Sequence, residues 1–160
     1  MRFSGFAPVC DKNSKLLILG SFPSVKSRAE GFYYGNPQNR FWRTVCGFFG
    51  EEAPKTIEGK TDFLLRRGIA LWDVIVSCEV VGSSDASIKD EVVADIPSLV
   101  EKSKISAILC NGTKSYSLLA EKFPELVHIT VKMPSTSPAN PRFSIESWKA
   151  ELNRIFMQNS

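Results

Sequence analysis

Four short apolar runs, each followed by a turn-forming or polar residue, are spaced along the chain. They cover residues 16–19, 69–75, 105–110 and 127–133, and Gly20 and Pro134 follow the first and the last of them. Residues that are apolar at every position, rather than at alternate positions, are typical of a strand that is buried on both faces of a parallel sheet. The pattern therefore predicts four parallel strands.

Between these runs, apolar residues recur with the period of a helix. The large apolar residues of segment 41–49 fall on one helical stripe, with Asn39 at the expected N-cap and Gly50 after the last turn. Phe41 and Trp42 are expected in the core. Further helices are predicted over 61–67, 95–102, 114–123 and 145–156, the third capped by Thr113 and the last by Ser144.

The alternation of strand and helix predicts an α/β protein with right-handed crossovers. We expect a three-layer α/β/α architecture with a central, mostly parallel four-stranded sheet. The 160 residues are 43% hydrophobic, which is enough for one core without metal or disulfide support. Residues 1–160 are therefore predicted to form a single domain, and we expect a monomer.

Charge and cysteine usage narrow the class of protein. The net charge of +3 means that contact with nucleic acid would depend on a local cluster of Lys and Arg. The four cysteines contain no C-x-x-C pair and His128 is the only histidine, so neither a metal site nor a cofactor is expected. No apolar signal segment or membrane span is evident, so the expected location is the cytoplasm, with the nucleoid if the source is prokaryotic.

The chain's unusual chemistry follows the predicted strands, in segments 20–39, 73–85, 111–113 and 134–140. Ligands of open parallel sheets bind beyond the carboxyl ends of the strands. Residues 31–42 are rich in aromatic rings and carboxamides. Such rings can stack on a nucleobase, carboxamides can read its edge or hold a water, and an arginine can meet phosphate. The sequence thus favours a pocket for a flat polar ring.

Three motifs carry a family resemblance: Gly20–Ser24 (GSFPS), Tyr34–Trp42 (YGNPQNRFW) and Pro134–Asn140 (PSTSPAN). They resemble the active-site motifs of the uracil-DNA glycosylase superfamily, and among its branches most resemble the hypoxanthine-DNA (deoxyinosine) glycosylases. The resemblance implies a monofunctional DNA glycosylase of base excision repair, without cofactor. It would flip deaminated bases out of damaged double-stranded DNA, hypoxanthine first and uracil second, and hydrolyse the N-glycosidic bond.

The resemblance also implies roles for individual residues. Related mismatch-specific enzymes hold the attacking water with an Asn at the position of Phe22, and a phenylalanine cannot do so. The hypoxanthine branch implies Asn39 as the catalytic residue instead. Tyr34 matches the ring that stacks on the extruded base, and Asn36 stands where many relatives have His. The full expected set is Asn39 for catalysis; Tyr34, Phe22, Asp73 and Asn111 for the base; and Ser21, Ser24, Arg40, Lys132, Ser135, Thr136, Ser137 and Asn140 for DNA.

Each residue also has a structural interpretation. Asn39 could cap the helix that follows, Asp73 could bind loop amides, and Asn111 before Gly112 could form a turn. Arg40 could be a charged residue on the solvent-exposed side of the helix. Asp85 lies in a polar loop, where we expect it to have a capping role.

Other functions remain open from sequence. The alternatives are a mismatch-specific uracil/thymine DNA glycosylase and a non-catalytic module that binds nucleic acid or nucleotides. A hydrolase that pairs a cysteine with His128 is a third, which no motif supports.

Overall fold

The computed structural model describes residues 2–80 and 88–157, so Asp85 and its expected capping role lie outside the described residues. Its larger sheet has the strand order β3-β2-β6-β7 with every neighbouring pair parallel. The strands are β2 (Leu16–Gly20), β3 (Ile69–Asp73), β6 (Ala107–Asn111) and β7 (Thr130–Met133). The predicted central sheet of four parallel strands is confirmed.

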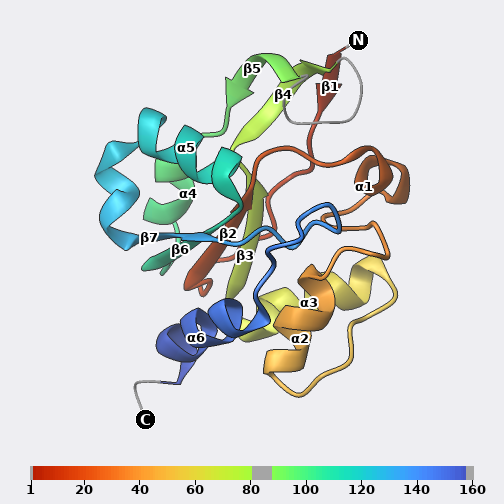
Figure 1. Ribbon diagram of the computed structural model, residues 1–160. Helices are drawn as coiled ribbons and strands as arrows, with labels where there is room; N and C mark the ends of the chain where they lie inside the picture. The colour runs from red at the N-terminus through yellow and green to blue at the C-terminus, as the bar shows by residue number, and fades with distance from the viewer. Residues whose placement is uncertain (1, 81–87, 158–160) are drawn as a thin grey trace.

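Helices cover both faces of this sheet, which gives the predicted three layers (Figure 1). On one face pack α2 (Phe41–Phe48), α3 (Ile57–Arg67) and α6 (Ile145–Phe156); on the other pack α4 (Ile96–Glu101) and α5 (Thr113–Lys122). In β2, Leu16 and Ile18 face the first group of helices, and Leu17 and Leu19 face the second. All four are fully buried, which explains why this strand is apolar at every position.

A second, antiparallel sheet was not predicted. It has the order β1-β4-β5 and consists of β1 (Arg2–Ser4), β4 (Ile75–Val80) and β5 (Ile88–Val93). The apolar run 69–75 is not one strand as predicted, because β3 ends at Asp73 and β4 begins at Ile75 in the other sheet. The amides of Val74 and Ile75 donate to the carbonyls of Gly20 and Ser21, which places the change of sheet beside the end of β2.

Several predicted boundaries also differ. The helix predicted from Thr61 begins at Ile57 after a Thr56 cap, and Thr113 is the first residue of α5 rather than its cap. The strand predicted over 127–133 is shorter, because a 3₁₀ helix, η2 (Pro124–Ile129), occupies its start. Segment 25–30, for which no helix was predicted, forms α1 (Val25–Glu30). The Ser144 cap of α6 is confirmed: its hydroxyl accepts the Ser147 amide at 3.2 Å.

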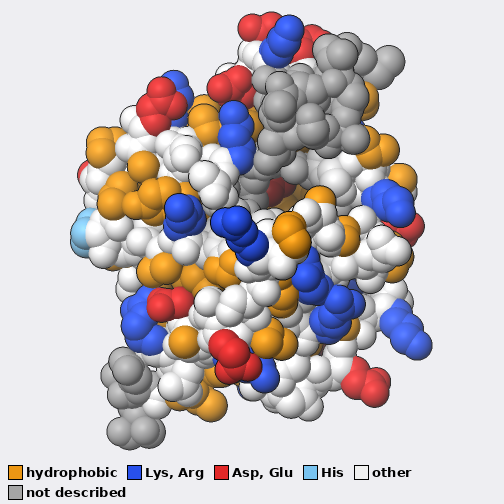
Figure 2. Space-filling view, viewed as in Figure 1, with side chains coloured by type: hydrophobic (Ala, Val, Ile, Leu, Met, Phe, Trp, Pro, Cys, Tyr) orange, Lys and Arg blue, Asp and Glu red, His pale blue; other side chains and the backbone are white. Residues whose placement is uncertain are grey.

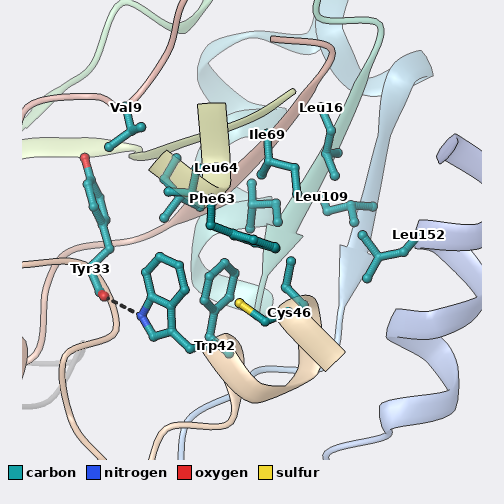
Figure 3. Close-up of a cluster of buried hydrophobic side chains, with 14 of the residues drawn as sticks. Val9, Leu16, Tyr33, Trp42, Cys46, Phe63, Leu64, Ile69, Leu109 and Leu152 are labelled. Atoms are coloured by element: carbon teal, nitrogen blue, oxygen red, sulfur yellow. Dashed lines mark hydrogen bonds between the residues drawn. The ribbon is translucent and has the colours of Figure 1, made fainter. Parts of the chain in front are cut away.

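An aromatic cluster fixes segment 31–42 against the sheet. Phe41 and Trp42 are buried, as predicted. The Trp42 indole Nε1 donates to the Tyr33 carbonyl at 3.0 Å, shown as the dashed line in Figure 3. The Tyr33 hydroxyl in turn donates to the Ala7 carbonyl at 2.7 Å. Because these rings are packed and hydrogen bonded, the polar residues between them are held in place at the edge of the sheet.

None of the helices in the described parts of the chain is both long and apolar enough to span a membrane.

Candidate active site

A pocket of about 760 Å³ lies at the carboxyl ends of β2, β3 and β6, where the sequence placed the site. Its walls come from segments far apart in the chain: residues 20–28, residues 33–39, the strand-end residues Asp73 and Asn111, and residues 135–140. Of the predicted site residues, the pocket brings together Asn39, Tyr34, Phe22, Asp73, Asn111, Ser21, Ser24, Ser135, Thr136, Ser137 and Asn140. It does not include Arg40 or Lys132.

Gly20, Asp73 and Tyr34 meet on one side of the pocket. A Cβ atom on Gly20 would lie 2.5 Å from Asp73 Oδ1 and 3.0 Å from the Tyr34 hydroxyl, so only glycine lets both polar groups approach the end of β2. The Asp73 side chain is buried. Burial first, and the Asp73 carboxylate second, raise the pKa of the Tyr34 phenol well above its usual range. Tyr34 therefore remains a neutral hydroxyl near a buried carboxylate.

Tyr34 has an unusual backbone conformation. Its φ of 52° lies in the left-handed region, which costs a non-glycine residue about 1–2 kcal/mol. The neighbouring turn holds it there, since the Gly35 amide donates to the Ser27 hydroxyl at 3.1 Å. The Tyr34 ring stacks on Phe41 with centroids 4.3 Å apart. Phe41 thus covers one face of the ring, which leaves only its other face and its edge for a ligand.

Asn39 lies directly before the first helical turn of α2. The N-cap position belongs to Arg40, not to Asn39 as predicted. Even so, Asn39 Oδ1 accepts a hydrogen bond from the Phe41 backbone amide at 2.9 Å. The backbone amide of Asn39 donates to the Asn36 carbonyl, also at 2.9 Å. The carboxamide is therefore fixed at the pocket wall, and no other described residue uses its second oxygen lone pair or its amino group. The structural and catalytic interpretations are compatible.

Residues 135–140, here called the serine loop, are held from β6 by Asn111. Asn111 Oδ1 accepts the Thr136 amide, and Nδ2 donates to the Thr136 hydroxyl, both at 2.9 Å. The Thr136 side chain has no exposed surface. The hydroxyl oxygen thus helps to anchor the loop by accepting from Asn111, and the predicted contact of Thr136 with DNA stays a prediction. Asn111 lines the pocket. A hydrogen bond from its second amino hydrogen, or to its second oxygen lone pair, could contact a base, and this contact stays a prediction.

Arg40 anchors the same loop from the other side. Its guanidinium Nη2 donates to the carbonyls of Ser137 and Asn140, and its backbone amide donates to the Thr136 carbonyl at 3.0 Å. The guanidinium also lies 4.5 Å from the centroid of the Phe143 ring. Arg40 therefore has a structural role, because it joins the start of α2, next to Asn39, to the serine loop. Its predicted contact with DNA stays a prediction.

Short polar bonds shape the serine loop internally. The hydroxyls of Ser135 and Ser137 accept the amides of Ser137 and Ala139 at 3.1 and 3.2 Å, and Asn140 Oδ1 accepts the Arg142 amide at 3.0 Å. Each bond spans two residues, as in Asx and ST turns. Neither serine hydroxyl donates a hydrogen bond to another described residue, so contacts of Ser135, Ser137 and Asn140 with DNA stay predictions.

The other predicted contacts lie around the rim. Ser24 caps α1 by accepting the Ser27 amide at 3.1 Å, and the ring of Phe22 packs against the core beside the pocket. Ser21 also lines the pocket. Lys132 is exposed on β7 and borders a smaller hollow of about 380 Å³ together with Arg142. Lys132 could reach DNA only outside the main pocket.

Among the lining residues outside the predicted site set, two come from a helix that the sequence analysis did not predict. Ser27 is buried and holds the turn that carries Tyr34. Arg28 also lines the pocket, and both belong to α1. Segment 25–30 has no clear apolar period, so its helix was not predicted; the basic residue four positions after Ser24 was the only available signal.

Neither a cluster of potential metal ligands nor a cysteine thiol lies at the pocket among the described residues. Within residues 2–80 and 88–157, no three His, Cys, Asp or Glu side chains are grouped as metal ligands. Burial raises the pKa of the Cys46 thiol to about 11 and that of Cys110 to about 12. Neither these cysteines nor His128 lines the pocket. The described residues thus offer no cysteine nucleophile at this site.

Known proteins resemble this chain over most of its length. Residues 7–156 match the profile of the uracil DNA glycosylase superfamily. The chain is 40% identical over 158 residues to a hypoxanthine DNA glycosylase of Methanosarcina acetivorans, covering 95% of this chain and 96% of the relative. It is 37% identical over 117 residues to a hypoxanthine DNA glycosylase of Methanosarcina barkeri, covering 72% of this chain and 74% of the relative.

A solved structure agrees. The solution NMR structure of a provisionally assigned uracil DNA glycosylase from Methanosarcina acetivorans superposes with a TM-score of 0.81 at 38% identity, covering 97% of this chain and 99% of that one. Fold, motif order and overall similarity therefore agree with the resemblance found in the three motifs. The chain belongs to the uracil DNA glycosylase superfamily.

Proposed function

We propose that this protein is a monofunctional DNA glycosylase that removes deaminated bases from double-stranded DNA, hypoxanthine first and uracil second, in base excision repair. The names of the two relatives support this substrate class. The observation that carries the proposal is the single pocket in which Asn39, Tyr34 and the serine loop meet. Without that pocket, the three motifs would be only a sequence pattern.

The pocket suits the hydrolysis of an N-glycosidic bond. As the bond breaks, positive charge develops on the sugar and negative charge on the departing base, so the site needs a positioned water and donors to the base. Asn39 would hold the water through its free lone pair. A carboxamide is too weakly basic to abstract a proton outright, so leaving-group stabilisation must supply most of the rate.

The same pocket offers complementary groups for the base. Hypoxanthine and uracil both present an N–H beside a carbonyl, where adenine and cytosine present a bare ring nitrogen beside an amino group. The buried Asp73 carboxylate can accept from that N–H, and the Asn111 amino group can donate to the carbonyl. Stacking on the face of Tyr34 that Phe41 does not cover would add about 1–3 kcal/mol, against a flipping cost of a few kcal/mol.

We expect a monomer as the active form. The family match over residues 7–156 likewise supports one glycosylase domain over residues 1–160. The expected setting is the cytoplasm, with the nucleoid in a prokaryote.

Lys and Arg side chains surround the middle of the face shown in Figure 2, where the chain after β7 crosses in Figure 1. This local arrangement supports DNA binding despite the modest net charge of +3.

The decisive experiment is an excision assay on fluorescent duplexes that carry inosine, uracil, xanthine or a thymine mispair. We expect alkali-labile abasic sites, fastest with inosine. No nick and no borohydride-trapped adduct should form, because no lysine among the described residues lines the pocket. A preference for the thymine mispair would instead favour the mismatch-specific alternative, and DNA binding without any base release would favour the non-catalytic module.

The Asn39→Ala variant tests the catalytic assignment in the same assay. Excision should fall by at least about 100-fold with DNA affinity largely kept, since the water would lose its holder. Asn153→Ala, on the exposed side of α6, is the matched control and should behave as wild type. Normal excision by a folded Asn39→Ala protein would remove this residue from the mechanism.

A further inference from the structure

Arg28 brings a positive charge to the wall of the pocket. Among the described lining residues it carries the only positive charge, and Asp73 carries the only negative one. The serine loop, which forms another part of the wall, offers only neutral donors. Any anion that enters the pocket therefore meets one described cation, and that cation comes from α1.

The guanidinium of Arg28 is held by aromatic rings rather than by a carboxylate. Its Cζ lies 4.3 Å from the centroid of Phe3 on β1 and 5.6 Å from the centroid of Phe22 in the loop after β2. No described carboxylate comes within ion-pair distance of it. Stacking on rings fixes the plane of a guanidinium while leaving its N–H edge open to other partners.

We propose that Arg28 binds a backbone phosphate of the strand that carries the target base. This inference rests on the proposed glycosylase function. An extruded nucleotide brings a phosphate on each side of it into the site. The serine loop can receive one phosphate with hydroxyl and amide donors, and Arg28, from a different part of the wall, can receive the other with its planar fork. The two rings hold this fork before DNA arrives, which lowers the entropic cost of the contact.

The phosphate contact explains a feature that base recognition does not. A half-buried arginine that has no carboxylate partner among the described residues is poorly compensated in the free protein, and phosphate would compensate it. The sequence motifs of the family resemblance do not include this residue, because Arg28 falls between the first motif and the aromatic one.

The test compares Arg28→Met with wild type on an inosine duplex at several salt concentrations. Loss of one phosphate contact should weaken DNA binding about fivefold to tenfold at low salt. It should also reduce the slope of log K against log salt by about 0.9. Arg154→Met, at an exposed ion pair on α6, is the matched control and should keep the wild-type slope.

Neutral methylphosphonates placed one at a time beside the inosine then locate the contact. One position should weaken binding by wild type but not by Arg28→Met. Arg28→Lys should recover the salt slope without recovering full affinity, because a lysine lacks the planar fork. If Arg28→Met lowers only the excision rate, with unchanged salt slope and methylphosphonate pattern, the phosphate assignment is overturned. Absence of excision by wild type would instead refute the proposed function itself.

Discussion

At the scale of single residues, the site depends on how closely polar groups can approach the end of β2. Gly20 is the residue that permits this, since a Cβ there would lie 2.5 Å from Asp73 Oδ1. A contact that short forces the buried carboxylate to move. The hydrogen-bonding surface offered to a base would then change although neither Asp73 nor Tyr34 had been replaced.

Gly20→Ala should therefore reduce excision of inosine more than it reduces DNA binding, and should destabilise the fold by about 1–3 kcal/mol. Gly47→Ala is the matched control, because a Cβ at this helical position in α2 meets open space and should stabilise the protein by about 0.5–1 kcal/mol. Excision and chemical denaturation curves measure both effects. Wild-type activity of Gly20→Ala would show that the arrangement of Asp73 and Tyr34 is not critical.

The roles of Asn39 and Arg40 show what sequence can predict at this scale. The sequence correctly predicted that Asn39 and the segments around it lie at the site, because residue type and motif order can be read from the sequence alone. It predicted contacts of Arg40 and Thr136 with DNA, but it did not predict that both residues also anchor the serine loop. The carbonyl partners of Arg40 lie 97 and 100 residues away, and the Asn111 partner of Thr136 lies 25 residues away, so these contacts depend on tertiary packing.

At the scale of elements, the serine loop is held between β6 and α2. Asn111 at the end of β6 anchors it through Thr136, and Arg40 at the start of α2 anchors it through several carbonyls. The loop is thus preorganised before DNA binds, because its internal hydrogen bonds are already formed. The arrangement also connects the loop to Asn39, the residue next to Arg40.

Arg40→Met should loosen this loop, because carbonyls of the loop lose their charged donor. We expect a loss of stability of about 1–3 kcal/mol and faster hydrogen exchange of the loop amides, with slower excision. Arg40→Lys should not restore the loop, since an ammonium group cannot reproduce the fork geometry. Arg43→Met, at an exposed position of the same helix, should leave stability unchanged. Unaltered amide exchange in Arg40→Met would contradict the anchoring role.

The predicted and unpredicted elements differ in physical character. The four strands of the central sheet were found because burial on both faces requires continuous apolar runs, as in β2. The antiparallel sheet was missed because β1 has only three residues and β4 follows β3 after Val74 with no turn signal between them. Nothing local marks the point where the chain passes from one sheet to the other.

At the scale of the whole molecule, the distribution of thiols separates this protein from a cysteine hydrolase. Cys46, Cys78 and Cys110 are buried, and only Cys10 is partly exposed. With pKa values raised to about 11 for Cys46 and about 12 for Cys110, these two thiols are almost wholly protonated at neutral pH and would form thiolates only as the pH rises toward those values.

Iodoacetamide at neutral pH should therefore add at most one adduct by intact mass, at Cys10, and excision should be unchanged. Cys10 does not line the pocket, so its modification leaves the base, the water and the phosphates unaffected. Inactivation that tracks a single adduct would revive a thiol mechanism, whereas inactivation only after denaturant exposes the core would agree with a site that works through carboxamide, carboxylate and hydroxyl groups.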